Sequence, residues 1–177
     1  GPPPQSDAKG RGNHRHWWGA KPPLLRGAAR RRRRAKRTNK MEYKKQLKYP
    51  HLGPEDTEIW SRFIEKNPDF YSEVDYDIKV GEGRDYSTLP EDQYSEDLKY
   101  LSKKRIDVEA LRPGEIHIIE LKPRANLSAL GQALGLASIY REAGPADKRI
   151  LPVVITDEIL PDMEKISAKM GILLFKA

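Results

Sequence analysis

Three polar side chains on a predicted β-hairpin have the types and spacing of a metal-assisted hydrolytic site. Residues 105–123, RIDVEALRPGEIHIIELKP, read as two strands with Asp107 on the first and Glu120 and Lys122 on the second. Residues 112–115, RPGE, form the predicted turn, because proline presets one backbone angle and glycine accepts the positive φ that follows. Side chains alternate along a strand, so Glu120 and Lys122 lie on the same face.

Carboxylates from two adjacent strands can hold a hard cation. Mg²⁺ or Mn²⁺ takes oxygen ligands and leaves positions for water and a phosphate oxygen. Lys122 could orient the water or neutralise charge that develops on the phosphate. The alternative is an exposed Glu120–Lys122 ion pair of little energetic value. Glu120 lies between Ile119 and Leu121, a position typical of a buried strand, where an unpaired charge is costly.

The elements that must position these residues follow from periodicity and turn signals. An apolar stripe at helical spacing predicts the first helix, and residues 81–98 are acidic and turn-rich, which predicts a loop. The predicted elements are a helix at 54–67, a strand at 71–80, the hairpin at 105–123, a helix at 129–143, a strand at 149–156, a helix at 161–170 and a strand at 171–175. This is the order αβββαβαβ, which predicts a three-layer α/β/α sandwich with a mixed central sheet.

The first predicted helix places one acid toward the sheet. Asp56 lies one turn before the apolar stripe of this helix and on the same side, Glu55 lies beside the stripe, and Glu58 lies opposite. Asp56 is therefore a candidate site residue, with Glu55 as the reserve. The alternative is that Asp56 caps the helix or interacts with its dipole.

The motif of Asp107 followed by Glu120-Leu121-Lys122 resembles the PD-(D/E)xK nuclease superfamily. This superfamily includes restriction endonucleases, archaeal Holliday-junction resolvases and RecB-type nucleases. The resemblance covers about residues 56–175 and includes the order of the elements, which is the superfamily core with one helix and one strand appended. Ile106 stands where the nominal proline of the motif would be.

The resemblance implies a restriction endonuclease-like fold and a Mg²⁺-dependent (or Mn²⁺-dependent) nuclease acting on DNA. It implies that Asp107, Glu120 and the Leu121 carbonyl ligate the metal, that Lys122 positions the water, and that Asp56 adds an acid from the first helix. Gln132 resembles a glutamine that some RecB-type nucleases place beside the metal. Their tyrosine four residues later is replaced by Leu136, and the alternative is a glutamine paired with the backbone at the edge of its helix.

Charge divides the sequence into a basic arm, 1–48, and an acidic α/β domain, 49–177. The arm holds 16 of the 33 lysines and arginines but two of the 26 acids, which leaves 17 basic and 24 acidic residues in the domain. Such an arm is predicted to be disordered alone and to bind nucleic-acid phosphates. The candidate contacts are Arg30, Arg31, Arg32, Arg33, Arg34, Lys36 and Arg37. Alternatively, Gly1-Pro2 is a remnant of protease cleavage, or the natural product begins at Met41.

The chain has no cysteine, and its sequence shows neither a signal peptide nor a spanning helix, so we expect a soluble, cytoplasmic protein of a bacterial or phage-infected cell, without membrane contact. The expected partner is nucleic acid, with a homodimer or an assembly partner on the arm as further candidates. The alternative function is a catalytically silent, nuclease-like structural or nucleic-acid-binding protein, such as a phage virion or packaging component.

Overall fold

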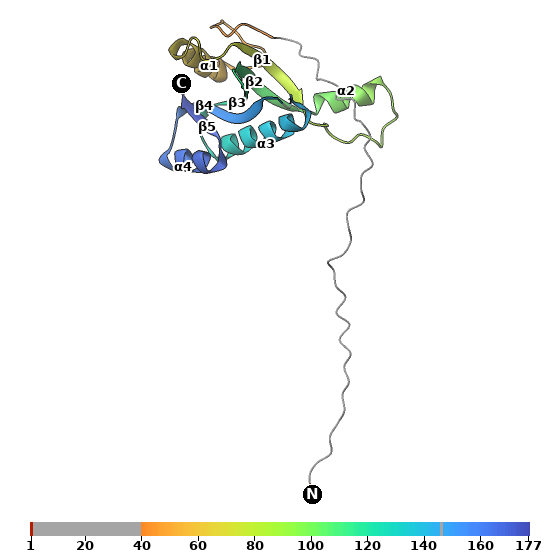
Figure 1. Cartoon of the computed structure of the whole chain (residues 1–177). Helices are drawn as coiled ribbons and strands as arrows, with labels where there is room; N and C mark the ends of the chain where they lie inside the picture. The colour runs from red at the N-terminus through yellow and green to blue at the C-terminus, as the bar shows by residue number, and fades with distance from the viewer. Residues whose placement is uncertain (2–39, 146) are drawn as a thin grey trace. The chain divides into compact units, whose positions relative to one another are not determined.

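A five-stranded mixed sheet forms the centre of the domain (Figure 1). The computed structural model describes residues 1, 40–145 and 147–177. The strands lie in the order β1 to β5 and are β1 (Glu73–Val80), β2 (Lys104–Arg112), β3 (Glu115–Arg124), β4 (Arg149–Glu158) and β5 (Leu173–Lys176). The first three strands pair antiparallel, and β4 and β5 continue the sheet in parallel.

In residues 40–145 and 147–177, four helices flank the sheet and make three layers. They are α1 (Pro54–Lys66), α2 (Gln93–Leu101), α3 (Leu127–Ala143) and α4 (Pro161–Met170). Helix α1 packs on one face of β3 and β4, while α3 and α4 cover the other face (Figure 1). The predicted α/β/α sandwich with a mixed central sheet is confirmed. None of the helices in the described part of the chain is both long and apolar enough to cross a membrane.

The predicted element order lacks one helix. Residues 93–101 form α2, whereas the sequence predicted a loop over 81–98. A capping box starts this helix. The Asp92 side chain accepts a hydrogen bond from the Ser95 N–H, and the Ser95 hydroxyl accepts one from the Asp92 backbone N–H. None of the residues of α2 is buried, so the apolar periodicity that reveals the other helices is weak here.

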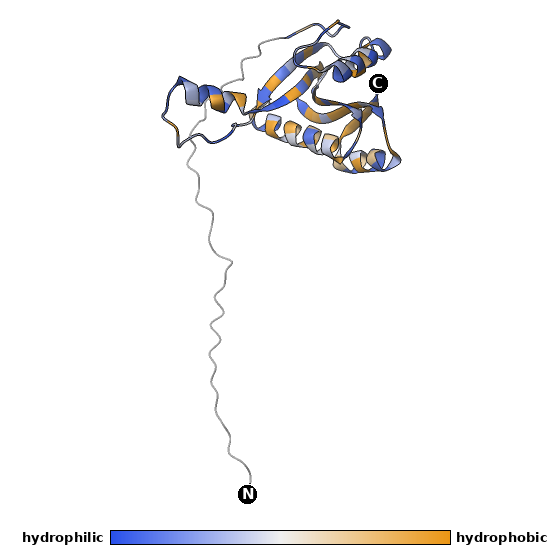
Figure 2. Cartoon of the chain, turned by 180° about the vertical axis from the view of Figure 1, so that it is seen from behind, coloured by the Kyte–Doolittle hydropathy of each residue, from blue (hydrophilic) through white to orange (hydrophobic). Residues whose placement is uncertain are grey.

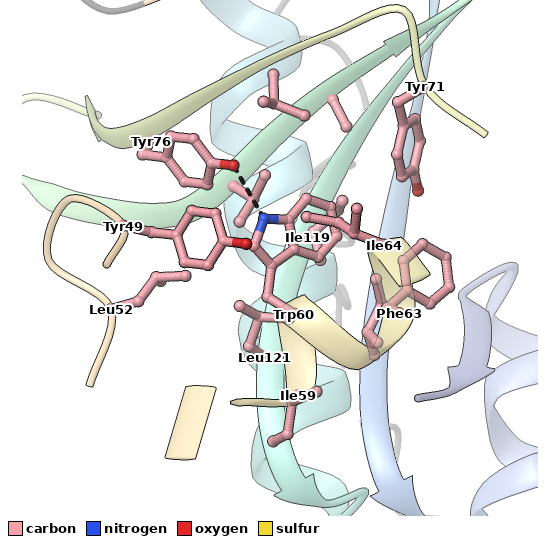
Figure 3. Close-up of a cluster of buried hydrophobic side chains, with 14 of the residues drawn as sticks. Tyr49, Leu52, Ile59, Trp60, Phe63, Ile64, Tyr71, Tyr76, Ile119 and Leu121 are labelled. Atoms are coloured by element: carbon pink, nitrogen blue, oxygen red, sulfur yellow. Dashed lines mark hydrogen bonds between the residues drawn. The ribbon is translucent and has the colours of Figure 1, made fainter. Parts of the chain in front are cut away.

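An aromatic cluster fixes α1 on the sheet (Figure 3). Trp60 is fully buried, and its indole N–H donates to the Tyr76 hydroxyl over 2.9 Å. Tyr49 is also fully buried, and Met41 bridges to Val74 in the sheet, so the packed domain includes residues that precede the predicted boundary at 49. In Figure 2 hydrophobic residues are concentrated on the strands and on α3, as expected for elements that are buried on a face.

The hairpin that carries the motif forms as predicted. Arg112 pairs with Glu115 across the turn, and Gly114 has φ 75, the value that a type II turn requires at this position. Along β3, Ile116 and Ile118 belong to a cluster with residues of α3. The alternate residues Ile119 and Leu121 pack in the cluster beneath α1, so the predicted faces of β3 are confirmed.

Side-chain alternation changes face midway along β1 and β2. Strict alternation along β1 would place Val74, Tyr76, Ile78 and Val80 on one face. Instead, Val74 and Tyr76 pack beneath α1, and Ile78 and Val80 pack with the α3 cluster. The cause lies at Asp77, whose φ of 56 interrupts the extended backbone. On β2 the matching change falls at Asp107, between Ile106 and Val108.

Candidate active site

The interruption of β2 turns the Asp107 side chain toward the backbone of β3. The regular pairing of the two strands ends at Val108 and Ile119. Two residues further along β3, the Leu121 N–H donates to Asp107 Oδ2 over 3.1 Å. The Asp107 carboxylate therefore takes the place that a backbone carbonyl of β2 would occupy in a continued ladder.

The Leu121 carbonyl faces the same gap between the strands. In an antiparallel pair a residue directs its N–H and its C=O at the same neighbouring strand. Because the Leu121 N–H points at Asp107 of β2, its carbonyl oxygen points toward β2 as well, beyond the last regular pair. The carbonyl therefore faces the side of β3 on which Asp107 lies, and its role as the third oxygen ligand stays a prediction.

Glu120 and Lys122 lie together on β3, one buried and one accessible. Lys122 Nζ is 3.0 Å from Glu120 Oε1, and the exposed fractions of the Lys122 and Glu120 side chains are 36% and 4% respectively. This burial contradicts the alternative of an ion pair in solvent. The ammonium instead lies where it can meet both the buried carboxylate and a ligand arriving from water.

The pKa values of Asp107, Glu120 and Lys122 are all raised by their surroundings. Burial, followed by the charge of Asp107, raises the pKa of Glu120 to about 7. Burial also raises the pKa of Asp107, although the Leu121 N–H and the Lys122 charge act against it. Burial lowers the pKa of the Lys122 ammonium, but the hydrogen bond and charge of Glu120 outweigh it, so the pKa of Lys122 is raised. Lys122 therefore stays charged, and its charge lowers the pKa of both acids against the effect of burial.

Asp56 belongs to the same electrostatic group. It is half-buried in the first turn of α1, and its charge raises the pKa of both Asp107 and Glu120. Glu55, the reserve candidate, is exposed. The helix is capped at Gly53 without a side-chain hydrogen bond, so Asp56 is not the capping residue of α1.

Gln132 is exposed on α3. Its amide donates to Ser128 Oγ over 3.0 Å, one turn earlier on the same helix, so the structure gives this side chain a partner on α3. The predicted role of Gln132 beside the metal stays a prediction. The arm residues from Arg30 to Arg37 lie outside the described residues, and their predicted contact with nucleic acid also stays a prediction.

Sequence reasoning missed three residues that meet next to Asp107. Asp77 contacts His51, with Nε2 to Oδ2 at 2.9 Å, and Arg105, with Nε to Oδ1 at 2.6 Å. Arg105 Nη1 also lies 3.2 Å from His51 Nδ1. A strand pattern gives no sign of this arrangement, because it depends on the positive φ of His51 and Asp77.

The donor set fits a hard divalent cation in its chemistry. It offers the carboxylates of Asp107 and Glu120 and a carbonyl oxygen, and a cation between the acids would offset the burial and the neighbouring acidic charges that raise their pKa values. Within residues 40–145 and 147–177 no three His, Cys, Asp or Glu side chains converge into a ready metal-binding group. A metal here would therefore depend on the two carboxylates and the backbone, with Asp56 contributing through its charge.

The fold and this site define a three-layer α/β/α domain with an acid, acid and lysine group at the divergence of two strands. No family model matches the chain, and no curated protein matches it. Among solved structures it is similar to a repair endonuclease from Pyrococcus abyssi, with 16% identity, 75% of this chain and 49% of that chain covered, and a TM-score of 0.42.

Two further solved structures show likeness at a similar level. One is the EndoMS-dsDNA2 complex, with 17% identity, 75% of this chain and 48% of that chain covered, and a TM-score of 0.42. The other is the protein VC1899 from Vibrio cholerae, with 17% identity, 68% and 29% covered, and a TM-score of 0.41. The chain spans about half the length of the first two structures and less than a third of the last.

Proposed function

We propose that this protein is a metal-dependent nuclease that hydrolyses phosphodiester bonds in DNA. The proposal is based on the burial of Glu120, its contact with Lys122 and its raised pKa. This carboxylate is almost fully buried, lies 3.0 Å from the Lys122 ammonium, and has a pKa raised to about 7 by burial and by the charge of Asp107. Acids held together against their repulsion, next to a lysine that remains charged, are suited to hold a divalent cation at a phosphate.

Each residue has a distinct role in this proposal. Asp107, Glu120 and the Leu121 carbonyl would hold Mg²⁺ or Mn²⁺, which when bound polarises a phosphate oxygen and acidifies water. Lys122 keeps its proton because Glu120 and Asp107 stabilise the ammonium. It can therefore orient a water molecule and stabilise the negative charge that grows on the phosphate oxygens.

Proton release links metal binding to pH. The ligand form of Glu120 is the carboxylate, and with a pKa of about 7 this group is mostly protonated in mildly acidic solution. A cation must then displace the proton. Metal binding and cleavage should therefore strengthen as the pH rises through 7.

Cleavage of a labelled DNA panel tests the proposal. The full chain would be incubated with Mg²⁺ or Mn²⁺ and end-labelled single-stranded, double-stranded and branched DNA. We expect cleavage by the wild type, and rates at least about 10²-fold lower for Asp107→Asn and for Glu120→Gln, as is typical when a group that stabilises the transition state is removed. Chelation of the metal should abolish cleavage.

Glu158→Gln is the matched control. Glu158 is an exposed acid on β4 that pairs with Arg124 at 2.6 Å, and its substitution also removes one negative charge near the end of the neighbouring strand. We expect its cleavage rate to stay within about twofold of wild type, as is usual for an exposed pair. Cleavage that survives in the Asp107 and Glu120 variants would contradict the assignment of the site.

The second candidate is a nuclease-like domain that binds nucleic acid without cutting it. The acidic balance of residues 49–177, with 24 acids against 17 basic residues, favours this candidate, because an enzyme acting on DNA usually presents a positive groove. It would be supported if the wild type bound DNA but cut no substrate with either metal. Substitution of Asp107 or Glu120 would then leave DNA affinity unchanged or raise it.

A further inference from the structure

A cluster of three charged or titratable side chains lies beside the candidate active site and is not used by the proposed chemistry. Asp77 is at its centre, 2.9 Å from His51 Nε2 and 2.6 Å from Arg105 Nε. Arg105 and His51 also approach each other, with Nη1 and Nδ1 3.2 Å apart. We refer to His51, Asp77 and Arg105 as the Asp77 cluster.

The cluster is built on unfavourable backbone. His51 has φ 58 and Asp77 has φ 56, and among the described residues no other non-glycine residue has a positive φ. Such conformations are uncommon for residues with a Cβ, although Asp and His adopt them more readily than most, and they tend to occur at functional sites. Here the two residues contact each other through their side chains. Those side chains are partly exposed, and exposed ion pairs contribute little to stability, so the pairing alone does not account for the strain.

The cluster adjoins Asp107. Asp77 on β1 and Asp107 on β2 both lie between the pairs Tyr76–Val108 and Ile78–Ile106. Arg105 precedes Asp107 by two residues, or roughly 6–7 Å along the strand. The positive charge of Arg105 acts on Asp107, because it lowers the pKa of that carboxyl against the effect of burial.

The two nitrogen-bearing side chains face solvent, whereas the acid is recessed. The exposed fractions are 42% for Arg105 and 54% for His51, against 21% for Asp77. Asp77 can therefore hold the guanidinium in place through its charge without covering it.

We propose that the Asp77 cluster is a phosphate-binding subsite, in which Arg105, aligned by Asp77 and flanked by His51, contacts a DNA backbone phosphate next to the one that is cut. The proposal rests on the nuclease function proposed above. A guanidinium matches the planar oxygen pair of a phosphate and forms short, charge-assisted hydrogen bonds with it. Arg105 supplies this contact within a domain that is acidic overall. Asp77 is a positioning residue in this scheme.

A double-mutant cycle tests the subsite by combining the Arg105→Gln substitution with the neutralisation of single DNA phosphates. The substrate is a DNA that the full chain cuts at a mapped position, prepared as a series in which one methylphosphonate at a time replaces a charged phosphate. Wild type and Arg105→Gln are compared by kcat/KM on each DNA. We expect one position near the cut where neutralisation lowers kcat/KM of the wild type about tenfold, as when one charge-assisted hydrogen bond is removed, and hardly affects Arg105→Gln.

Three variants separate the geometry of the contact from charge alone. Lys79→Gln removes the same charge from the residue that pairs with Arg105 on β1, and this variant should retain the full wild-type sensitivity to the methylphosphonate. Arg105→Lys keeps the charge without the planar fork, and should retain only part of the sensitivity. Asp77→Asn removes the anchoring charge, but asparagine tolerates the positive φ of this position, and it should weaken the same contact mainly through KM.

The subsite would be overturned if, at every methylphosphonate position, kcat/KM fell by the same factor for wild type and for Arg105→Gln. If no DNA is cut, the same series is read by equilibrium binding with Ca²⁺ in place of Mg²⁺, and the absence of any position where the two proteins differ would again overturn it. A Mn²⁺ titration followed by thermal unfolding distinguishes the two proposals. Arg105→Gln should keep the Mn²⁺-dependent rise in Tm, whereas a wild type without that rise contradicts the metal site rather than the subsite.

Discussion

At the scale of single residues, the site is defined by a conflict between burial and charge. Glu120 is 4% exposed and depends on Lys122 for its compensation. Asp107 reduces its own cost by accepting the Leu121 N–H. These contacts do not fully offset the burial of the two carboxylates, because the pKa values of both are still raised. The pair is therefore held in place by the fold, at the expense of stability near neutral pH.

Glu120→Gln should stabilise the protein in a pH-dependent manner. The pKa of Glu120 is about 7 in the folded state against 4.5 for the free group, so its contribution to stability is fully present below pH 4.5 and is lost as the pH rises through 7. The difference corresponds to a contribution on the order of 3 kcal/mol at 1.36 kcal/mol per pKa unit. The gain of the variant over wild type should grow from pH 5 to pH 8.

Urea unfolding of the metal-free protein at several pH values measures this difference. The exposed Glu158, substituted by glutamine, is the control, and its free energy of unfolding should follow that of wild type over the same range. Parallel curves for wild type and Glu120→Gln would mean that Glu120 titrates like an ordinary carboxylate. The electrostatic basis of the site would then be wrong.

The sequence predicts the residues on regular strands, but not those that depend on an irregular backbone. Glu120 and Lys122 were placed on one face because β3 is a regular strand, in which period-two alternation holds. Asp77 could not be assigned from the pattern, because its positive φ of 56 is allowed for aspartate but not indicated by it. Since His51 and Arg105 are held together through Asp77, the whole cluster was missed.

At the scale of elements, the strands and the apolar helices follow from the sequence, and α2 does not. Its apolar residues Tyr94, Leu98 and Leu101 have helical spacing but leave none of the helix buried, so the acidic, turn-rich character of the segment dominates the pattern. What ties α2 to the domain is local. Gly83 lies so close to the helix that a Cβ at this position would be 2.3 Å from the Lys99 carbonyl oxygen.

Gly83→Ala should therefore detach α2 from the loop that precedes it. Gly83 has φ 78, which an alanine adopts only with strain, at a cost of about 1–2 kcal/mol. The contact with Lys99 adds a steric conflict to this strain. We expect faster hydrogen exchange across α2 than in wild type, with little change in β3 and β4.

Gly114→Ala is the control for backbone strain at a positive-φ glycine away from α2. Gly114 has φ 75, but a Cβ there would meet no atom within 4 Å, so this variant carries the backbone strain without the steric conflict. It should leave hydrogen exchange in α2 at the wild-type rate. Exchange in α2 that is no faster in Gly83→Ala than in Gly114→Ala would contradict the role given to Gly83.

At the scale of the whole molecule, positive charge and the candidate active site are separated along the chain. The arm holds 16 of the 33 basic residues, whereas the rest of the chain has more acids than bases. Nucleic-acid affinity that arises from phosphate contacts is steeply dependent on salt. If the arm supplies most of these contacts, binding strength and catalysis become separable properties of this protein.

Replacing Arg30, Arg31, Arg32, Arg33 and Arg34 by glutamine in the full chain should lower DNA affinity and flatten its salt dependence. Each phosphate that an arginine no longer neutralises reduces the slope of log K against log[salt] by about 0.9 for duplex DNA, so the slope should fall by up to roughly 4–5. The binding titrations are made between 50 and 200 mM salt with Ca²⁺. An unchanged slope would mean that the arm makes no phosphate contacts, and kcat at saturating DNA should not change in either case.

The change of face at Asp77 and Asp107 also constrains how this fold can vary in length. On one side of that point the apolar side chains of β1 and β2 face α1, and on the other side they face α3. The two strands change face at the same place. A one-residue insertion or deletion in only one of them would bring apolar and polar side chains of the partners out of phase. Relatives of this protein should therefore carry length changes here in matched pairs, or none at all, which makes the spacing between Tyr76 and Ile78 a useful marker when distant sequences are aligned.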